Sequence, residues 1–157
     1  MSNTASAIQD QLGDNPCWGC GPNTTAGLHV KSYIGRDQSV CTWQAAPHHV
    51  GWPGVLSGGI LAAVIDCHCV CTAIADAYQV DGRPLGSQPA IGYATGSLSI
   101  SYLQPVPIAA AVELSAHIAD RAARKTVVAC TVSAHGRLCA RAEVIAIRLT
   151  ERLGANA

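Results

Sequence analysis

Apolar and polar residues alternate through the second half of the chain with the period of two that is typical of β-strands. The alternation is clearest at Leu98, Ile100 and Tyr102, which are separated by serines. Four stretches follow this pattern: 97–102, 112–120, 126–134 and 138–149. Short connections at 121–124 and 135–137 join the last three stretches, so the pattern predicts four strands, three of them linked by hairpins.

One stretch in the first half, from residue 58 to about Gln79, has the period of an α-helix instead. Its apolar stripe consists of six side chains: Ile60, Val64, Cys67, Cys71, Ile74 and Tyr78. Before this helix, residues 28–33 and 39–45 predict a pair of strands. After it, residues 80–94 contain too much proline and glycine for regular structure and predict a long loop, a common form for a lid or pocket wall. Residues 1–14 are expected to be frayed or to form a short helix.

The order of elements, β-β-α-β-β-β-β, predicts a single α+β domain over residues 1–157, in which a six-stranded antiparallel sheet wraps a long central helix. The chain is long enough to bury a substantial core. Hydrophobic residues make up 49% of it and charged residues 13%. This composition excludes disorder and indicates that part of the surface is hidden in an oligomer.

The formal net charge is zero and the pI is near 7.0, so the chain has no electrostatic footprint for nucleic acid or an anionic membrane. The N-terminal residues have neither the basic region nor the apolar core of a signal peptide. No apolar run is expected to approach the roughly 20 residues that span a bilayer. We therefore expect a cytoplasmic protein without nucleic-acid or membrane partners.

Most of the eight cysteines are interpreted as small buried hydrophobic residues, since several occupy core positions and no secretion signal is present. Cys17 and Cys20 form a single Cys-x-x-Cys pair, which supplies half of a zinc site. The helix offers four further ligands: Cys67, His68, Cys69 and Cys71. Their spacing in a helix points three of them in different directions. A redox dithiol is a second alternative, although the pair neither follows a strand nor opens a helix. The expectation is a packed, tight turn and no metal.

A glycine-rich loop opens directly into the predicted helix. Gly51, Gly54, Gly58 and Gly59 let the backbone turn sharply and leave no side chains between a ligand and the main-chain N–H groups. Ser57 is a candidate N-cap, which would direct the first-turn N–H donors into the mouth of the loop. Such a helix start suits an anion or a developing oxyanion. An ordinary loop that caps a core helix fits the same residues.

One carboxylate, Asp66, lies about two turns inside this helix, among small residues: Ala62, Ala63, Val70, Ala73 and Ala77. A carboxylate on such a close-packed face is a candidate for acid–base or nucleophilic chemistry, and a structural aspartate that caps a neighbouring loop is the alternative. Gly58 and Asp66 are eight residues apart, which is about 12 Å along the helix axis. Two such helices packed antiparallel would bring Asp66 of one chain beside Gly58 of the other. This spacing predicts a site shared across a two-fold dimer.

A second pattern surrounds the helix start: His49-x-Gly51-x-Pro53-Gly54-x-x-Ser57-Gly58-Gly59, with Asp66 seven residues after Gly59. It resembles the helix-start motif of the PaaI-like acyl-CoA thioesterases. The opening Cys17-Trp-Gly-Cys20-Gly-Pro-Asn is similar to a segment found in part of the same superfamily. With the order of elements, the resemblance extends from about residue 15 to residue 150. It implies the hotdog fold and an acyl-CoA thioesterase of the 4HBT superfamily, working as a homodimer or homotetramer.

The resemblance also implies roles for individual residues. Asp66 would act as nucleophile or as general base for water, and the N–H of Gly58 from the opposite subunit would polarise the thioester carbonyl. Thr95 matches a position where a hydroxyl holds the attacking water; a strand-start hydroxyl bonded to the backbone is the alternative. No metal or cofactor is required, because coenzyme A arrives as part of the substrate. Arg121 and Arg124 are candidate contacts for coenzyme A, or else belong to a solvated hairpin.

Two positions depart from the family pattern. Ser57 stands where a histidine is common, and Gly51 stands where some members have asparagine. His49, or else His48, is then the candidate to polarise the carbonyl, with an ordinary loop histidine as the alternative. Gly51, Ser57 and Gly59 remain candidate substrate contacts. These departures keep a second function open, that of a non-catalytic protein that binds acyl thioesters.

Overall fold

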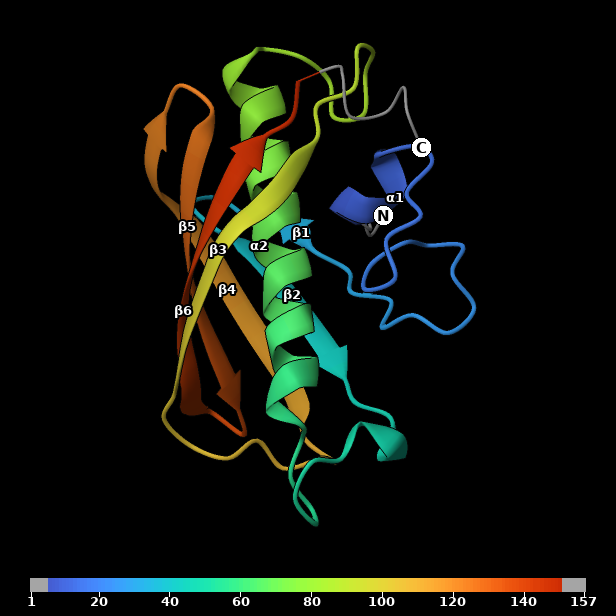
Figure 1. The fold of residues 1–157 in the computed structure, drawn as a ribbon, viewed down its shortest axis with the longest axis vertical. Coiled ribbons are helices and arrows are strands. Elements are labelled where there is room, and N and C mark those ends of the chain that lie inside the picture. The colour runs from blue at the N-terminus through green and yellow to red at the C-terminus, as the bar shows by residue number, and fades with distance from the viewer. Residues whose placement is uncertain (1–5, 151–157) are drawn as a thin grey trace.

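The computed structural model describes residues 6–150 and shows a six-stranded antiparallel sheet wrapped around one long helix (Figure 1). The elements in chain order are α1 (Ile8–Gln11), β1 (Tyr33–Ile34), β2 (Ser39–Gln44), the 3-10 helix η1 (Pro47–His49), α2 (Gly58–Val80), β3 (Tyr93–Tyr102), β4 (Ala111–Ala122), β5 (Lys125–Ala134) and β6 (Arg137–Arg148). The strands lie in the order β1-β2-β4-β5-β6-β3, and each neighbouring pair is antiparallel. This arrangement confirms the predicted fold class. The ends of the expected domain, residues 1–5 and 151–157, lie outside the described part.

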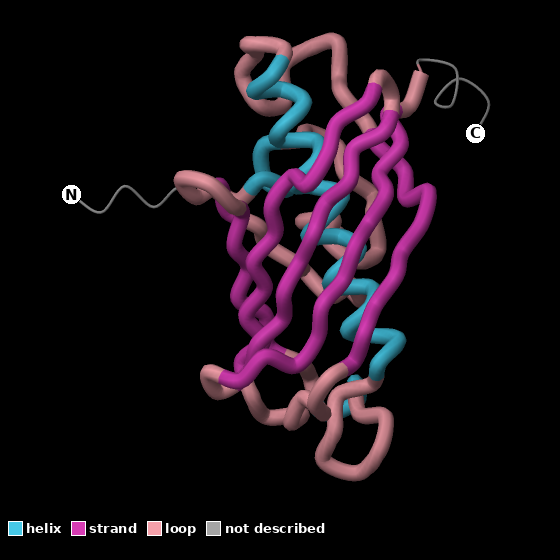
Figure 2. The backbone as a smooth tube through the Cα atoms, turned by 90° about the vertical axis from the view of Figure 1, so that its left-hand side faces the viewer, coloured by secondary structure: helices cyan, strands magenta, loops and turns pink. Residues whose placement is uncertain are grey.

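The core forms where α2 lies against the inner face of the sheet, behind the strands in Figure 2. Burial alternates residue by residue along β5, so that Val128, Cys130 and Val132 face the helix. Several inward positions on β4 and β6 are alanines, including Ala116, Ala140 and Ala146. These small side chains allow the curved sheet to approach the helix closely.

The buried surface of α2 is wider than the single stripe that its periodicity predicts. His68 and Thr72, which do not belong to that stripe, are buried as well, whereas Ile60 at the helix start is only partly buried. The sheet covers one side of α2 and residues 12–32 run along another, as Figure 1 shows in blue. The partly exposed side of the helix carries Ala62, Asp66 and Val70.

The expectation that no apolar segment is long enough for a membrane is wrong for α2. By length and composition this 23-residue helix could cross a bilayer, since Asp66 and Asp76 are its only charged residues. In the described structure, however, 56% of its most apolar window is buried inside the protein. The helix is apolar because it packs on both the sheet and the N-terminal segment.

The predicted strand at 28–33 is mostly absent, since only Tyr33–Ile34 pairs with β2. The residues before it are held by the turn around Trp18 instead: the N–H of Leu28 donates to the carbonyl of Trp18, and that of Val30 to the carbonyl of Gly19. Alternating hydrophobicity therefore reflects burial against this turn, without a ladder of strand hydrogen bonds.

Strand β3 lies at the edge of the sheet and starts earlier than predicted, at Tyr93. Its register against β6 shifts between Thr95 and Ser97. A Cβ at Gly96 would lie 2.8 Å from Cγ1 of Ile147, so glycine suits this bulge. Thr95 pairs with the buried Ala146, and Leu98 pairs with a buried residue of β6 as well. The bulge therefore places Thr95 and Leu98 on the same, inner face although they are three residues apart.

Candidate active site

The bulge in β3 directs the hydroxyl of Thr95 toward the carboxylate of Asp66 on α2. The Thr95 hydroxyl donates a hydrogen bond of 2.6 Å to Oδ1 of Asp66. This length is typical of a hydroxyl bonded to a charged carboxylate. Thr95 is exposed and Asp66 is partly buried in the described chain. The two residues that the sequence motif placed at the centre of the site are thus in direct contact.

A cavity of about 820 Å³ opens beside this pair. Asp66 and Val70 of α2 form one side of it, and Tyr93 and Thr95 of β3 form another. The turn that carries Cys17 forms a third side. Because the lining is largely apolar and includes a few polar groups, among them Asp66 and Thr95, the cavity has the usual make-up of a small-molecule site.

The start of α2 lies at the other end of the inner face of β3. Ser57 occupies the N-cap position with an extended backbone, as predicted, but its hydroxyl makes no capping hydrogen bond. The first-turn N–H groups of Gly58 and Gly59 have no partner within the helix, and both glycines are exposed. The hydroxyl of Tyr102 donates to the carbonyl of Gly58 at 2.7 Å. Tyr102 has the inward register on β3 that the alternation predicts, yet its contact with the helix start could not be read from the sequence.

The glycine-rich loop is folded tightly back on itself. The Ser57 N–H donates to the carbonyl of His49 at 2.9 Å, and a bridge joins Val50 to Leu56. A Cβ at Gly51 would lie 3.0 Å from Cα of Ser57, which makes a larger residue there difficult to accommodate. The absence of a side chain at Gly51 is therefore explained by the close approach of the two loop arms.

The ring of His49 has structural partners at the base of this loop. Its Nδ1 accepts a hydrogen bond of 2.9 Å from the Ala46 N–H, and the ring stacks on Trp43 with 5.5 Å between centroids. Burial, and then the neighbouring charge of His48, lower the pKa of His49. In the neutral ring the proton then lies on Nε2. These contacts make His49 an anchor of the loop, and its role toward a substrate remains a prediction.

Four cysteines meet on the other wall of the cavity. Sγ of Cys17 lies 3.8 Å from Sγ of Cys67, and Sγ of Cys20 lies 4.0 Å from Sγ of Cys71. Cys67 and Cys71 are four residues apart and share one face of α2, as the predicted apolar stripe requires. Hydrogen bonds from Cys67 and Cys71 lower the pKa of the Cys20 thiol. No disulfide joins any of the cysteines, all of which lie within residues 6–150.

No protein-family model matches the chain. Among solved structures, a thioesterase superfamily protein from Shewanella loihica PV-4 is 31% identical, with a TM-score of 0.63 over 77% of this chain and 91% of that one. The chain belongs to the thioesterase superfamily. The superfamily and the hotdog fold inferred from the helix-start motif are thereby confirmed.

Two further proteins are similar to this chain. The PaaI protein of E. coli, from the phenylacetic acid degradation operon, is 11% identical with a TM-score of 0.64, covering 78% of this chain and 81% of that one, and shares the fold. The bovine acyl-coenzyme A thioesterase THEM4 is 28% identical over 95 residues, which are 60% of this chain. The chain spans about a third of the length of this curated relative.

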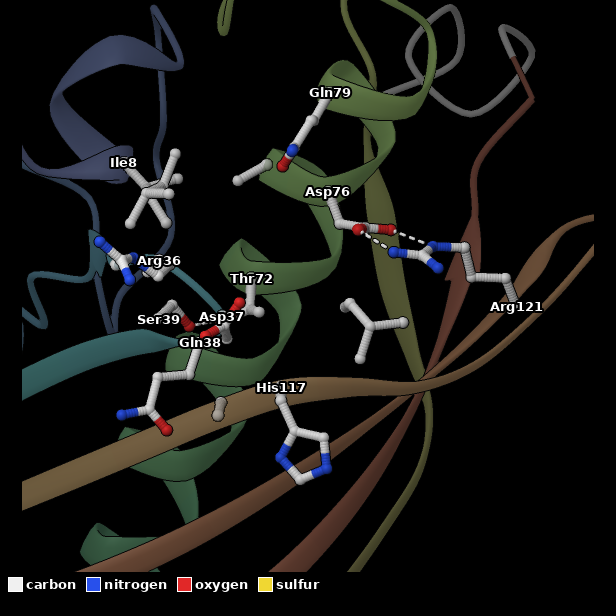
Figure 3. A pocket seen from close by; sticks show the side chains of 15 residues that line it. Ile8, Arg36, Asp37, Gln38, Ser39, Thr72, Asp76, Gln79, His117 and Arg121 are labelled. Carbon is white, nitrogen blue, oxygen red and sulfur yellow. Dashed lines mark hydrogen bonds and ion pairs between the residues drawn. The ribbon is translucent and has the colours of Figure 1, made fainter.

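The two arginines expected to contact coenzyme A in this thioesterase-superfamily chain lie away from Asp66. Arg121 belongs to β4 and forms a two-pronged ion pair with Asp76, with 2.7 Å between Nε and Oδ2. It lines a separate cavity of about 370 Å³ together with His117 (Figure 3). The side chain of Arg124 donates to the carbonyl of Arg148. Within the described chain, neither arginine lines the cavity beside Asp66.

Proposed function

We propose that this protein is an acyl-CoA thioesterase in which Asp66 activates the attacking water or attacks the thioester itself. The observation that carries the proposal is the hydrogen bond from Thr95 to Asp66 at the mouth of a largely apolar cavity. Membership of the thioesterase superfamily and similarity to an acyl-coenzyme A thioesterase support the same chemistry. The predicted absence of a cofactor and the cytoplasmic location remain part of this proposal.

The proposed reaction needs only groups of this chain and a water molecule. Thr95 occupies one oxygen of the Asp66 carboxylate, so the other oxygen can accept a proton from water. The water oxygen then attacks the thioester carbonyl, and the carbonyl oxygen becomes an oxyanion. When the oxyanion collapses, the carbon–sulfur bond breaks and coenzyme A leaves with the proton as a free thiol. In the alternative route the carboxylate attacks the thioester carbonyl, the carbon–sulfur bond breaks and coenzyme A leaves as a thiolate, which takes up a proton when water hydrolyses the resulting anhydride.

The oxyanion is proposed to bind at the N–H of Gly58 of the partner subunit. Within one chain Gly58 and Asp66 are separated by about 12 Å of helix, and the cavity beside Asp66 does not include Gly58. The exposed edge of β3 and the partly exposed side of α2 that carries Ala62 offer surfaces for a second chain. We therefore propose a homodimer, or a dimer of dimers, as the active form.

The test is thiol release from a panel of short, long and aromatic acyl-CoAs. We expect hydrolysis by the wild-type protein and a loss of about 10²-fold or more for Asp66→Asn, because general acid–base catalysis contributes on that scale. The matched control is Asp81→Asn, which makes the same change at the end of α2, where Asp81 pairs with Arg148. Equal turnover by Asp66→Asn and Asp81→Asn would contradict the catalytic assignment.

A second candidate function is acyl-thioester binding without hydrolysis. Ser57 occupies the position of a common family histidine, and its side chain makes no capping bond. If the wild-type protein binds acyl-CoA saturably and releases no thiol from any member of the panel, this binding function replaces the proposed enzyme.

A further inference from the structure

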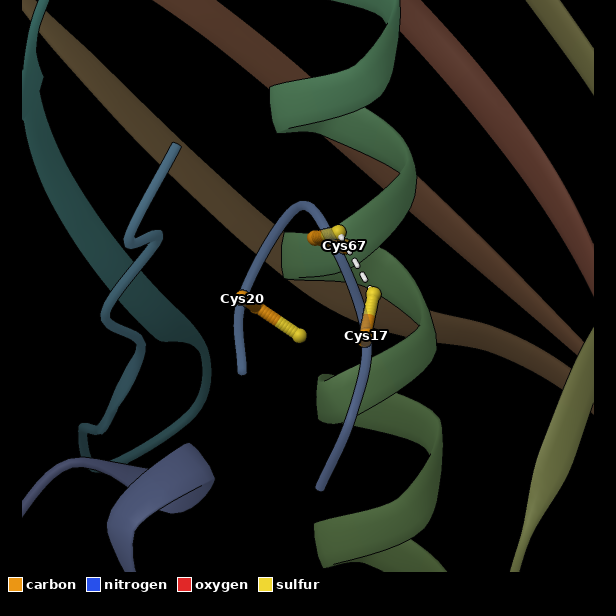
Figure 4. Close-up of side chains that lie close together, drawn as sticks. All are labelled: Cys17, Cys20 and Cys67. Atoms are coloured by element: carbon orange, nitrogen blue, oxygen red, sulfur yellow. Dashed lines mark hydrogen bonds between the residues drawn. The ribbon is translucent and has the colours of Figure 1, made fainter. Parts of the chain in front are cut away.

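Three cysteine thiols from two distant parts of the chain converge beside the cavity. Cys17 and Cys20 lie in the turn before β1, and Cys67 lies on α2 (Figure 4). Their sulfurs all lie within 4.8 Å of one another. A fourth sulfur, that of Cys71, lies 4.0 Å from the sulfur of Cys20. Cys71 lies outside the group of three, in which Cys17 and Cys20 have the spacing Cys-x-x-Cys that occurs in zinc sites.

The backbone of the turn is shaped around these sulfurs. A Cβ at Gly19 would lie only 2.3 Å from Sγ of Cys67, so the sulfur occupies the space that any side chain there would need. A Cβ at Gly21 would lie 2.6 Å from the carbonyl oxygen of Cys17. The Gly21 N–H donates to that same carbonyl at 2.7 Å and closes the turn. Both glycines are thus required for the turn to lie against the helix as closely as it does.

The spacing of three of these sulfurs is close to that of thiolate coordination. With zinc–sulfur bonds of about 2.3 Å, the sulfurs of a tetrahedral site lie about 3.8 Å apart. The sulfurs of Cys17 and Cys67 are 3.8 Å apart, and those of Cys17, Cys20 and Cys67 all lie within 4.8 Å of one another. We propose that Cys17, Cys20 and Cys67 bind one Zn²⁺ ion. Each thiol that ligates the ion releases its proton to solvent.

Two further observations favour a metal over ordinary packing or a disulfide. Cys17 is exposed to solvent, so its position beside Cys67 is not explained by burial of an apolar side chain. The side-chain amide of Asn15 donates to Sγ of Cys20 at 3.6 Å, the type of outer contact that orients a metal-bound thiolate. A single disulfide would use two of the three sulfurs and would not account for the position of the third.

The ion would tie the turn to α2 immediately after Asp66. Cys17 and Cys20 both line the same cavity as Asp66, so a bound Zn²⁺ would fix one of its walls. Three protein sulfurs would leave one position of a tetrahedral ion for a water molecule. This proposal departs from the expectation of no metal, and it is independent of the thioesterase activity.

The test is the metal content and the metal affinity of the reduced full-length protein. We expect elemental mass spectrometry to find one Zn²⁺ per chain. Replacement of Zn²⁺ by Co²⁺ should produce a thiolate-to-metal charge-transfer absorption band. Zn²⁺ should protect Cys17 from alkylation, and a chelator should restore its reactivity. Cys17→Ser should weaken binding at least tenfold without unfolding the protein, because this side chain is exposed.

The matched control is Cys139→Ser, a cysteine on β6 outside the cluster, which should bind Zn²⁺ like the wild-type protein. Unchanged affinity in Cys17→Ser, or equal alkylation of Cys17 with and without Zn²⁺, would overturn the proposal. Recovery of a Cys17–Cys67 disulfide in place of bound metal would overturn it too. Each of these readouts is independent of hydrolysis, so a failed metal site and a failed enzyme assignment are distinguishable.

Discussion

Replacing Thr95 by valine removes the hydroxyl beside Asp66 and keeps a β-branched side chain of the same shape. The lost hydrogen bond is short, at 2.6 Å, and its acceptor is a carboxylate. Hydrogen bonds to charged groups contribute about 1.5–3 kcal/mol. If this bond holds the carboxylate in its reactive orientation, the loss corresponds to roughly a 10- to 150-fold decrease in kcat.

The assay is steady-state thiol release with the best acyl-CoA of the panel. We expect the Thr95→Val change to appear in kcat while KM stays close to its wild-type value, because valine removes the bond to the carboxylate and keeps the shape of the side chain that lines the cavity. The free energy of unfolding should fall by no more than the contribution of the lost bond, since Thr95 is exposed on an edge strand in the described chain. Thr95→Ser restores the donor and should recover most of the activity. A Thr95→Val protein with wild-type kcat would refute the reasoning.

Two further predictions concern the fold. Gly96→Ala places a Cβ 2.8 Å from Cγ1 of Ile147, so it should destabilise the protein by about 1–3 kcal/mol in urea unfolding; an unchanged midpoint would contradict the tight fit of the bulge. Burial lowers the pKa of His68 to about 4, so the unfolded chain binds a proton more readily than the folded one. This contribution to stability is complete above the ordinary histidine pKa of about 6.5, and falls by about 3 kcal/mol as the pH decreases to 4. His68→Gln should flatten this part of the stability profile, and the same slope in both proteins would contradict the assignment to His68.

The sequence predicted the fold class because its helix and later strands give strong local signals. The helix follows from its periodicity, and the four later strands follow from alternation and hairpin connections. Thr95 was identified only through a family resemblance, since alternation counted back from Leu98 would point it outward. The bulge at Gly96 reverses that orientation, and a bulge is set by contacts with β6 that local sequence does not reveal.

The remaining differences have the same origin in long-range contacts. Cys67 and Cys71 meet the Cys17 turn across fifty residues of chain, a pairing that helical spacing alone leaves open. Arg121 was a candidate contact for coenzyme A, or else part of a solvated hairpin, and its ion pair with Asp76 of α2 could not be predicted from its charge alone. Ion pairs and clusters of this kind depend on how distant elements pack, and a pattern in one segment carries little information about them.

The edge position of β3 has a consequence for the order in which the protein assembles. Strands β4, β5 and β6 are joined by short hairpins and can pair as soon as each is synthesised, whereas β3 must wait until the chain has passed through all three. Closing that long loop costs conformational entropy before the contacts between β3 and β6 can compensate for it, so β3 is expected to dock late. Its amide hydrogens should then exchange faster than those of β5 in the native protein. The bond between Thr95 and Asp66 is consequently made in one of the last steps of folding. Until β3 has docked, the Asp66 carboxylate lacks the hydrogen bond from Thr95.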